Sequence, residues 1–90
     1  MNNLLPISGQ SGYNIAFLKP QSFEDAQYAI EQLKQGTVVL FNLAALDPKL
    51  AQRISDYAAG STCAIAGEAR EVGNGVFIYT PPSVLIKTQL

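Results

Sequence analysis

Two spacings of apolar residues along the chain predict its helices and strands. From Phe23 to Leu33 apolar residues recur at steps of three and four, with charged and amide residues between them. This spacing is typical of an amphipathic helix. Ser22 is expected to begin the helix as its N-cap, and Gly36 is expected to end it.

A second helix is predicted after Asp47. This residue is a good N-cap, and the proline that follows it suits the first helical position because its missing N–H has no partner there anyway. An apolar stripe then runs from Leu50 to Ala58. Gly60 is expected to end this helix.

Five short segments are predicted to be strands because they are apolar or β-branched and are bounded by glycine, proline or charged residues. They are residues 14–19, 37–43, 61–66, 68–72 and 76–80. The tripeptide Gly73-Asn74-Gly75 separates the last two and predicts a hairpin turn. Residues 84–86 either add a short edge strand or pack as a tail.

This order of elements predicts an α/β two-layer sandwich, in which two helices pack on one face of a mixed sheet of about five strands. Residues 37–43 and 76–80 are apolar on both faces. Since two helices cover only one face, we expect a homodimer through the sheet. We place the core domain at residues 14–87, with a flexible N-terminal tail or linker remnant at residues 1–13 and a C-terminal tail at residues 88–90.

Composition excludes several classes of function. The chain has 90 residues, no histidine and a single cysteine, Cys63. Catalysis by Ser/His/Asp or Cys/His groups is therefore impossible, and imidazole metal ligands are absent. Cys63 cannot form an internal disulfide, so a cytoplasmic location is expected. We interpret Cys63 as a buried thiol in the strand predicted at residues 61–66.

The charges are few and balanced. Six Lys and Arg face seven Asp and Glu, giving a net charge of −1. Without a basic cluster we expect no nucleic-acid partner. Nothing in the pattern requires a metal or another cofactor, and we expect none.

The residues alone leave two interpretations open for the charges of residues 68–71 and the aromatic residues 77 and 79. Arg70 alternates with acidic residues, which is typical of a solvated strand face. Arg70 beside Phe77 and Tyr79 would instead form the rim of a peptide groove.

Several segments carry a family resemblance by their order and spacing. They are residues 19–26 (KPQSFEDA), 38–43 (VVLFNL), 46–48 (LDP), 53–60 (RISDYAAG), 64–67 (AIAG) and 72–81 (VGNGVFIYTP). From about residue 15 to residue 84 the chain resembles the core domain of the SepF family of bacterial cell-division proteins.

The resemblance implies a non-enzymatic α/β dimer at the division site. Such a protein binds the C-terminal tail of the tubulin-like protein FtsZ, bundles, aligns and tethers its filaments at the septum, and forms higher polymers. On this resemblance the tail pocket maps to Arg70, Glu71, Val72 and Phe77. Much of the family has a basic residue in place of Glu71.

The resemblance also places the dimer contact at Ala66 and Gly67, where many relatives have two glycines. SepF-like proteins usually carry an amphipathic membrane-binding helix and a linker before the core. In residues 1–13 of this chain Pro6 interrupts the apolar residues, and no basic residue flanks them. We therefore expect no direct membrane binding by this chain.

A small dimeric ligand-sensing module is the alternative function. Domains of this length and element order also bind metabolites at subunit boundaries. Its candidate polar residues are Asn42, Ser61 and Thr62.

Overall fold

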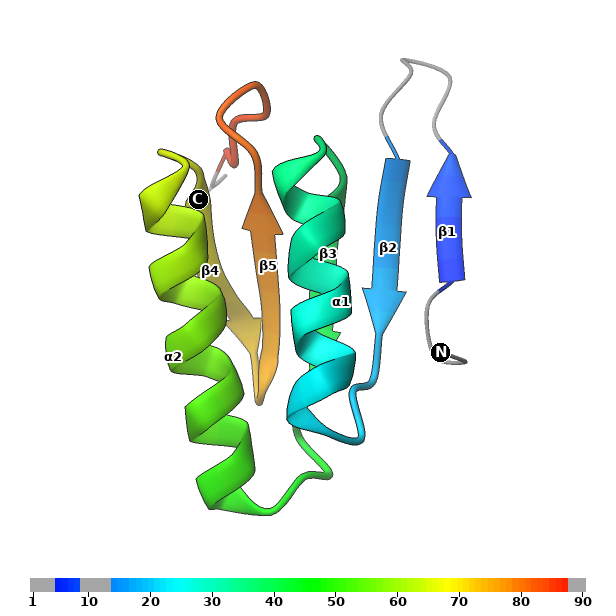
Figure 1. Ribbon diagram of the computed structural model, residues 1–90, viewed down its shortest axis with the longest axis vertical. Coiled ribbons are helices and arrows are strands. Elements are labelled where there is room, and N and C mark those ends of the chain that lie inside the picture. The colour runs from blue at the N-terminus through cyan, green and yellow to red at the C-terminus, as the bar shows by residue number, and fades with distance from the viewer. Residues whose placement is uncertain (1–4, 9–13, 88–90) are drawn as a thin grey trace.

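The computed structural model describes residues 5–8 and 14–87, which form a two-layer α/β sandwich (Figure 1). The elements in chain order are β1 (Leu5–Ser8), β2 (Asn14–Leu18), α1 (Phe23–Lys34), β3 (Val38–Asn42), α2 (Pro48–Ala64), β4 (Glu68–Gly73) and β5 (Val76–Thr80). Figure 1 shows both helices on the same face of the sheet. The predicted fold class, with two helices on one face of a mixed sheet, is confirmed.

The sheet has the strand order β1-β2-β3-β5-β4. Only β2 and β3 are parallel, and α1 connects them; the other neighbouring strands pair antiparallel. The carboxyl ends of β2 and β3 therefore lie beside the β4–β5 turn, at the end of the sheet where α2 begins (Figure 1). The β2–α1, β3–α2 and β4–β5 connections meet at this end of the molecule.

The caps of α1 form as predicted. The Ser22 hydroxyl accepts a hydrogen bond from the Asp25 N–H at 3.2 Å, and the Asp25 carboxylate accepts one from the Gln21 N–H at 2.9 Å. The two bonds satisfy N–H groups that have no partner within the helix. After the helix, Gly36 has φ +105, a backbone conformation that glycine adopts without steric cost.

The core lies between the helices and the sheet face that they cover. Its fully buried residues include Leu18 from β2, Ile30 from α1, Phe41 from β3, Ile54 from α2 and Tyr79 from β5. Each helix contributes the apolar stripe predicted from its spacing. Burying these side chains is the main stabilising term for so small a domain.

The prediction that α2 ends at Gly60 and a strand follows at residues 61–66 is wrong. The helix continues to Ala64 because Thr62 extends its buried stripe and Ile65, directly after the helix, packs against the core. Cys63 is consequently exposed on α2, not buried in a strand as predicted. The β-branched composition of this segment indicated a strand, but packing against the core decided for helix.

The N-terminal segment also differs from the prediction. Residues 5–8, placed in a flexible tail, form β1 and pair antiparallel with β2. The rest of that predicted tail and residues 88–90 lie outside the described residues. Residues 84–86 form no strand; the Ile86 N–H donates to the Glu68 carboxylate at 3.3 Å, so this segment packs back on β4.

The second face of the sheet carries no helix in the described part of the chain (Figure 1). Phe17, Leu40 and Ile78 are aligned by the strand register in one row across β2, β3 and β5. All three side chains are half-buried. We call this surface the open sheet face.

Candidate functional site

The β4–β5 hairpin carries the four residues predicted to bind a peptide tail. Its turn forms at Asn74 and Gly75 as predicted, with a β-bulge between Glu71 and Gly73. Glu71 lies directly opposite Phe77, and Arg70 lies opposite Ile78. Because neighbouring positions of a strand point to opposite faces, this register divides the four residues between the two faces.

Arg70 lies on the open sheet face, away from Phe77. Its guanidinium contacts the Glu68 carboxylate at 3.5 Å, and both side chains are exposed. The predicted combination of Arg70 as a charged rim beside the Phe77 anchor is therefore not brought together. An ion pair this exposed contributes little to stability.

Phe77 lies on the helix-covered face and is half-buried. One side of the ring packs on the core, where it stacks on Tyr79 with ring centroids 6.3 Å apart. It also lines a surface groove of about 250 Å³ between α2 and the hairpin. The lining residues are Leu43, Pro48, Ala51, Gln52, Ser55, Gly75 and Phe77. We call this the Phe77 groove.

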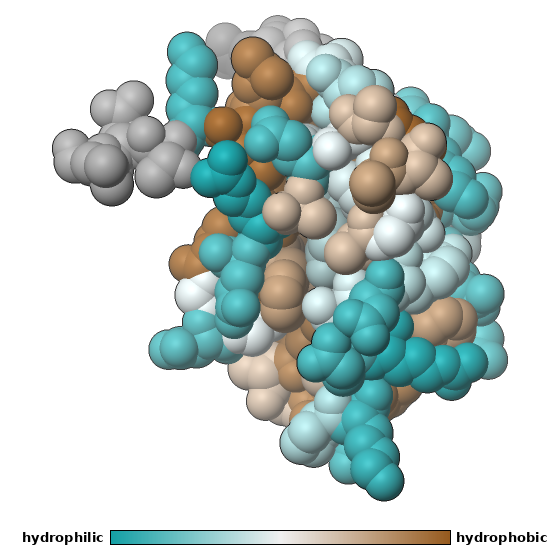
Figure 2. Space-filling view, turned by 90° about the vertical axis from the view of Figure 1, so that its left-hand side faces the viewer, coloured by the Kyte–Doolittle hydropathy of each residue, from teal (hydrophilic) through white to brown (hydrophobic). Residues whose placement is uncertain are grey.

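The groove combines an apolar floor with polar groups on one side. Leu43, Pro48, Ala51 and Phe77 supply carbon atoms, and Gln52 and Ser55 from α2 supply side-chain hydrogen-bonding groups. Figure 2 views the side of the molecule formed by α2 and β4, where brown apolar atoms reach the surface between teal side chains. Such a surface suits an extended peptide with an apolar side chain.

Glu71 and Val72 lie on the hairpin beside the groove. The Glu71 carboxylate accepts a hydrogen bond from the Gly75 N–H at 3.1 Å, so it fixes the turn that forms part of the groove wall. Val72 is 57% exposed at the bulge. Glu71 therefore has a structural contact of its own, and Val72 offers apolar surface close to the turn.

The residues predicted at the dimer contact, Ala66 and Gly67, connect α2 to β4. Ala66 has φ +62, in the left-handed region. A Cβ atom on Gly67 would collide with the backbone carbonyl oxygen of Thr80. The fold of a single chain therefore already accounts for glycine at position 67. The dimer contact at Ala66 and Gly67 stays a prediction.

The residues proposed for the alternative ligand-sensing function do not converge. Asn42 ends β3, whereas Ser61 and Thr62 lie near the other end of α2 (Figure 1). The buried Thr62 hydroxyl donates to the Ala58 carbonyl at 2.7 Å, so its proton is already used in a hydrogen bond within α2.

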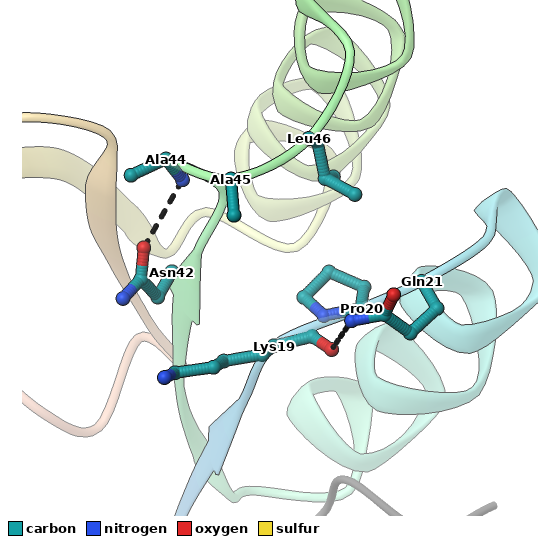
Figure 3. A pocket seen from close by; sticks show the side chains of 7 residues that line it. All are labelled: Lys19, Pro20, Gln21, Asn42, Ala44, Ala45 and Leu46. Carbon is teal, nitrogen blue, oxygen red and sulfur yellow. Dashed lines mark hydrogen bonds between the residues drawn. The ribbon is translucent and has the colours of Figure 1, made fainter.

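Asn42 instead lines a second, smaller cavity of about 130 Å³ (Figure 3). The cavity lies between the segments that follow β2 and β3. Its lining residues are Lys19, Pro20, Gln21, Asn42, Ala44, Ala45 and Leu46. We call it the strand-end cavity.

The α2 residues of the Phe77 groove were not predicted, although a signal existed. Pro48, Ala51, Gln52 and Ser55 follow the spacing of a helix face and lie beside the buried stripe. Finding them required the knowledge that the hairpin packs next to this face.

Two features are absent from the described residues. No group of three or more Cys, Asp or Glu side chains within residues 5–8 and 14–87 could hold a metal ion. No helix in those ranges has the length and apolar character needed to cross a membrane.

Comparison with known proteins gives a consistent family. The family described as "Cell division protein SepF" matches residues 15–86. A protein of that name from Gloeobacter violaceus is 41% identical over 81 residues, which are 89% of this chain and 42% of that protein. One from Lachnospira eligens is 39% identical over 85 residues, covering 92% of this chain and 46% of that protein.

A solved structure agrees on the fold. The SepF-like protein from Pyrococcus furiosus superposes with a TM-score of 0.65 at 21% identity, covering 81% of this chain and 89% of that one. The chain spans less than half the length of the two curated relatives described above. Because the family match covers most of its 90 residues, this chain belongs to the SepF family of cell-division proteins.

Proposed function

We propose that the chain acts in bacterial cell division as a non-enzymatic adaptor that binds the C-terminal tail of FtsZ in the Phe77 groove. Membership of the SepF family supports the role, and the groove supports the mode of binding. The observation that carries the proposal is that Phe77, half-buried and anchored on Tyr79, also lines an open groove beside α2. An aromatic ring held in this way is pre-organised to cover an apolar side chain of a partner.

The groove fits a short peptide better than a large folded partner. Its volume of about 250 Å³ accommodates one or two side chains. Gln52 Nε2 already donates to the Asp56 carboxylate at 2.8 Å, so the Gln52 carbonyl oxygen and the Ser55 hydroxyl are the side-chain groups proposed to hydrogen-bond to the main chain of an extended peptide. Charge contributes little, because none of the described residues that line the groove is charged.

A homodimer would carry two binding sites and would therefore connect neighbouring filaments. We propose that two chains meet through their open sheet faces, which would place two Phe77 grooves in one particle. Two linked sites bind neighbouring FtsZ tails with greater avidity than one site. Such a dimer would bundle, align and tether filaments at the septum. We further propose that it forms higher polymers and acts in the cytoplasm at the division site.

Replacing Phe77 tests the groove. The change Phe77→Ala should weaken binding of a synthetic FtsZ tail peptide by about 2 kcal/mol, roughly thirtyfold, because it removes the aromatic anchor. Isothermal titration calorimetry measures this effect. Arg70→Ala, on the opposite sheet face, should change the affinity by less than about twofold, as is common for exposed charges.

A second substitution separates lost binding from lost stability, because Phe77 also packs on the core. The change Ser55→Arg places a long side chain in the groove without removing core contacts, and it should abolish tail binding. Ala59→Arg, one turn further along α2 and exposed, is the matched control and should bind normally. Full tail affinity in a folded Ser55→Arg protein would show that the groove is not the tail site.

A further inference from the structure

The Phe77 groove has an uncharged floor, but each of its two walls carries a carboxylate. On the α2 wall, the Asp56 carboxylate accepts a hydrogen bond from Nε2 of the lining residue Gln52 at 2.8 Å. On the hairpin wall, the Glu71 carboxylate accepts one from the N–H of the lining residue Gly75 at 3.1 Å. Each carboxylate is thereby held within hydrogen-bond distance of a residue that forms the groove.

Glu71 is placed beside the aromatic anchor by the strand register. It lies directly opposite Phe77, and directly opposite side chains of antiparallel strands lie on the same face with their Cβ atoms about 5 Å apart. The bond to the Gly75 N–H involves Oε2. Because a carboxylate has two oxygens that accept, Oε1 can take a further donor. A cation can therefore pair with Glu71 while a neighbouring apolar group covers Phe77.

Neither carboxylate is neutralised by a basic side chain in the part of the chain that the structure describes. Asp56 and Glu71 both stay outside the ion pairs formed there. Arg70, the neighbour of Glu71 along β4, lies on the opposite sheet face, where it contacts Glu68. The hairpin wall of the groove is therefore negative.

The basic residues of α2 do not offset this charge. The Arg53 guanidinium lies over the Phe23 ring of α1, 4.1 Å from the ring centroid. Lys49 lies at the start of α2 together with the Asp47 carboxylate, which accepts a hydrogen bond from the Lys49 N–H at 3.1 Å. These two opposite charges balance each other, so the surroundings of the groove keep a net negative charge.

We propose that the peptide bound in the Phe77 groove carries a Lys or Arg two residues before or after its apolar anchor. The preference rests on the proposed function of the groove, and it names the chemistry of the ligand. Alternate residues of an extended peptide point to the same side, so this cation would reach Glu71 while the anchor covers Phe77. Asp56 adds to the attraction from the other wall. Because both carboxylates are exposed, they select among peptides more than they raise the affinity.

Charge variants of a synthetic FtsZ tail peptide test this preference. An alanine scan of the peptide first identifies the anchor as the apolar residue whose replacement weakens binding most. The residues two positions before and after the anchor are then changed together to Lys, Gln or Glu, and calorimetry at low salt measures each affinity. The Lys version should bind about threefold more tightly than the Gln version, and the Glu version about threefold more weakly. Equal affinities of the Lys and Glu versions would overturn the proposal.

Glu71→Gln tests the same contact from the side of the protein. The glutamine amide oxygen can still accept from the Gly75 N–H, so the turn is kept while the charge is lost. In this variant the Lys and Gln peptides should differ by less than about twofold. Glu24→Gln makes the same change at an exposed position of α1, which lines no part of the groove, and it should keep the full preference. An unchanged preference in Glu71→Gln would overturn the pairing of the cation with this residue.

The charge preference and the proposed function of the groove can fail separately. If Phe77→Ala and Ser55→Arg weaken binding of the tail peptide but its three charge versions bind alike, the groove is the tail site and only the charge preference is wrong. If a folded Ser55→Arg protein binds normally, the groove is not the tail site, and the assignment of a basic peptide to it is wrong as well. A threefold preference that is lost at high salt and in Glu71→Gln supports the proposal, because exposed charges are screened by salt.

Discussion

At the scale of single residues, the two helices end in the same backbone motif with different residues at its key position. After α1 the Thr37 N–H donates to the Gln32 carbonyl at 3.1 Å, and after α2 the Gly67 N–H donates to the Thr62 carbonyl at 2.9 Å. The residue before each donor must adopt a positive φ. Gly36 meets this requirement freely, whereas Ala66 adopts φ +62 at a steric cost.

Glycine is therefore expected to be more favourable than alanine at position 66, just after α2, and alanine more favourable than glycine at position 60, inside α2. Ala66→Gly should raise the free energy of unfolding by about 1 kcal/mol by removing the strain. Gly60→Ala should also raise it by about 1 kcal/mol, because position 60 is inside the helix and a Cβ there meets nothing within 4 Å. Urea denaturation measures both. The control Ala59→Gly, also inside the helix, should lower it by a similar amount.

Tyr79 has a buried hydroxyl without a hydrogen-bond partner in the described structure. Tyr79→Phe should therefore leave the free energy of unfolding within about 1 kcal/mol of the parent value at neutral pH. A loss above about 2 kcal/mol would mean that the hydroxyl has a partner. Thermal or urea unfolding of the variant measures the difference.

The same burial raises the pKa of Tyr79 well above its ordinary value. The unfolded chain ionises at this residue from about pH 10, and the folded chain does not. Stability conferred by this difference is complete below that pH and is lost as the pH rises further. Tyr79→Phe should reduce this alkaline loss, while Tyr28→Phe, 45% exposed, should keep it.

At the scale of elements, the connection between α2 and β4 depends on close backbone approach. Gly67 lies against the Thr80 carbonyl at the end of β5, where a Cβ would collide. Gly67→Ala should therefore lower the free energy of unfolding by more than about 2 kcal/mol, since backbone must move to relieve the contact. Gly60→Ala is the control that adds the same methyl group in open space.

The effect of Gly67→Ala on the free energy of unfolding decides whether substitutions at position 67 can test the proposed dimer contact. If Gly67→Ala lowers the stability of the single chain, the variant loses dimers because the chain unfolds. Such a loss would not show that Gly67 lies at the dimer contact. Circular dichroism melting curves that do not depend on protein concentration would assign the defect to the fold of one chain. An unchanged melting temperature in Gly67→Ala would contradict the close contact.

The hairpin shows why the candidate site was predicted only in part. Its turn residues indicated two antiparallel strands, and Phe77 was correctly placed next to the turn. The bulge between Glu71 and Gly73 was not predicted. Because a shift of one residue exchanges the faces of a strand, the sequence pattern left open which of Arg70 and Glu71 shares a face with Phe77.

At the scale of the whole molecule, the open sheet face carries no helix in the described structure. If it is the dimer contact, Leu40→Lys should convert a dimer to a monomer in sedimentation velocity at micromolar concentration, because it places a charge at the centre of the face. Gln27→Lys, exposed on α1, should remain dimeric. A monomeric parent chain would contradict the proposed homodimer.

The sequence by itself determined the elements whose signals are local. The caps of α1, the proline at the start of α2, the apolar stripes and the Gly73-Asn74-Gly75 turn each depend on neighbouring residues, and each formed as expected. The lack of histidine was equally decisive, because it removes whole classes of catalysis. The caps, the apolar stripes and the turn together predicted two helices on one face of a mixed sheet.

Only the tertiary structure decided features that depend on contacts distant in sequence. Packing of Thr62 and Ile65 on the core extended α2 through a segment with strand-like composition, and pairing with β2 drew residues 5–8 into the sheet. The register of the hairpin separated Arg70 from Phe77, and the packing of α2 beside it formed the groove. Local propensities differ by less than about 1 kcal/mol per residue, so burial and strand pairing outweigh them wherever the two disagree.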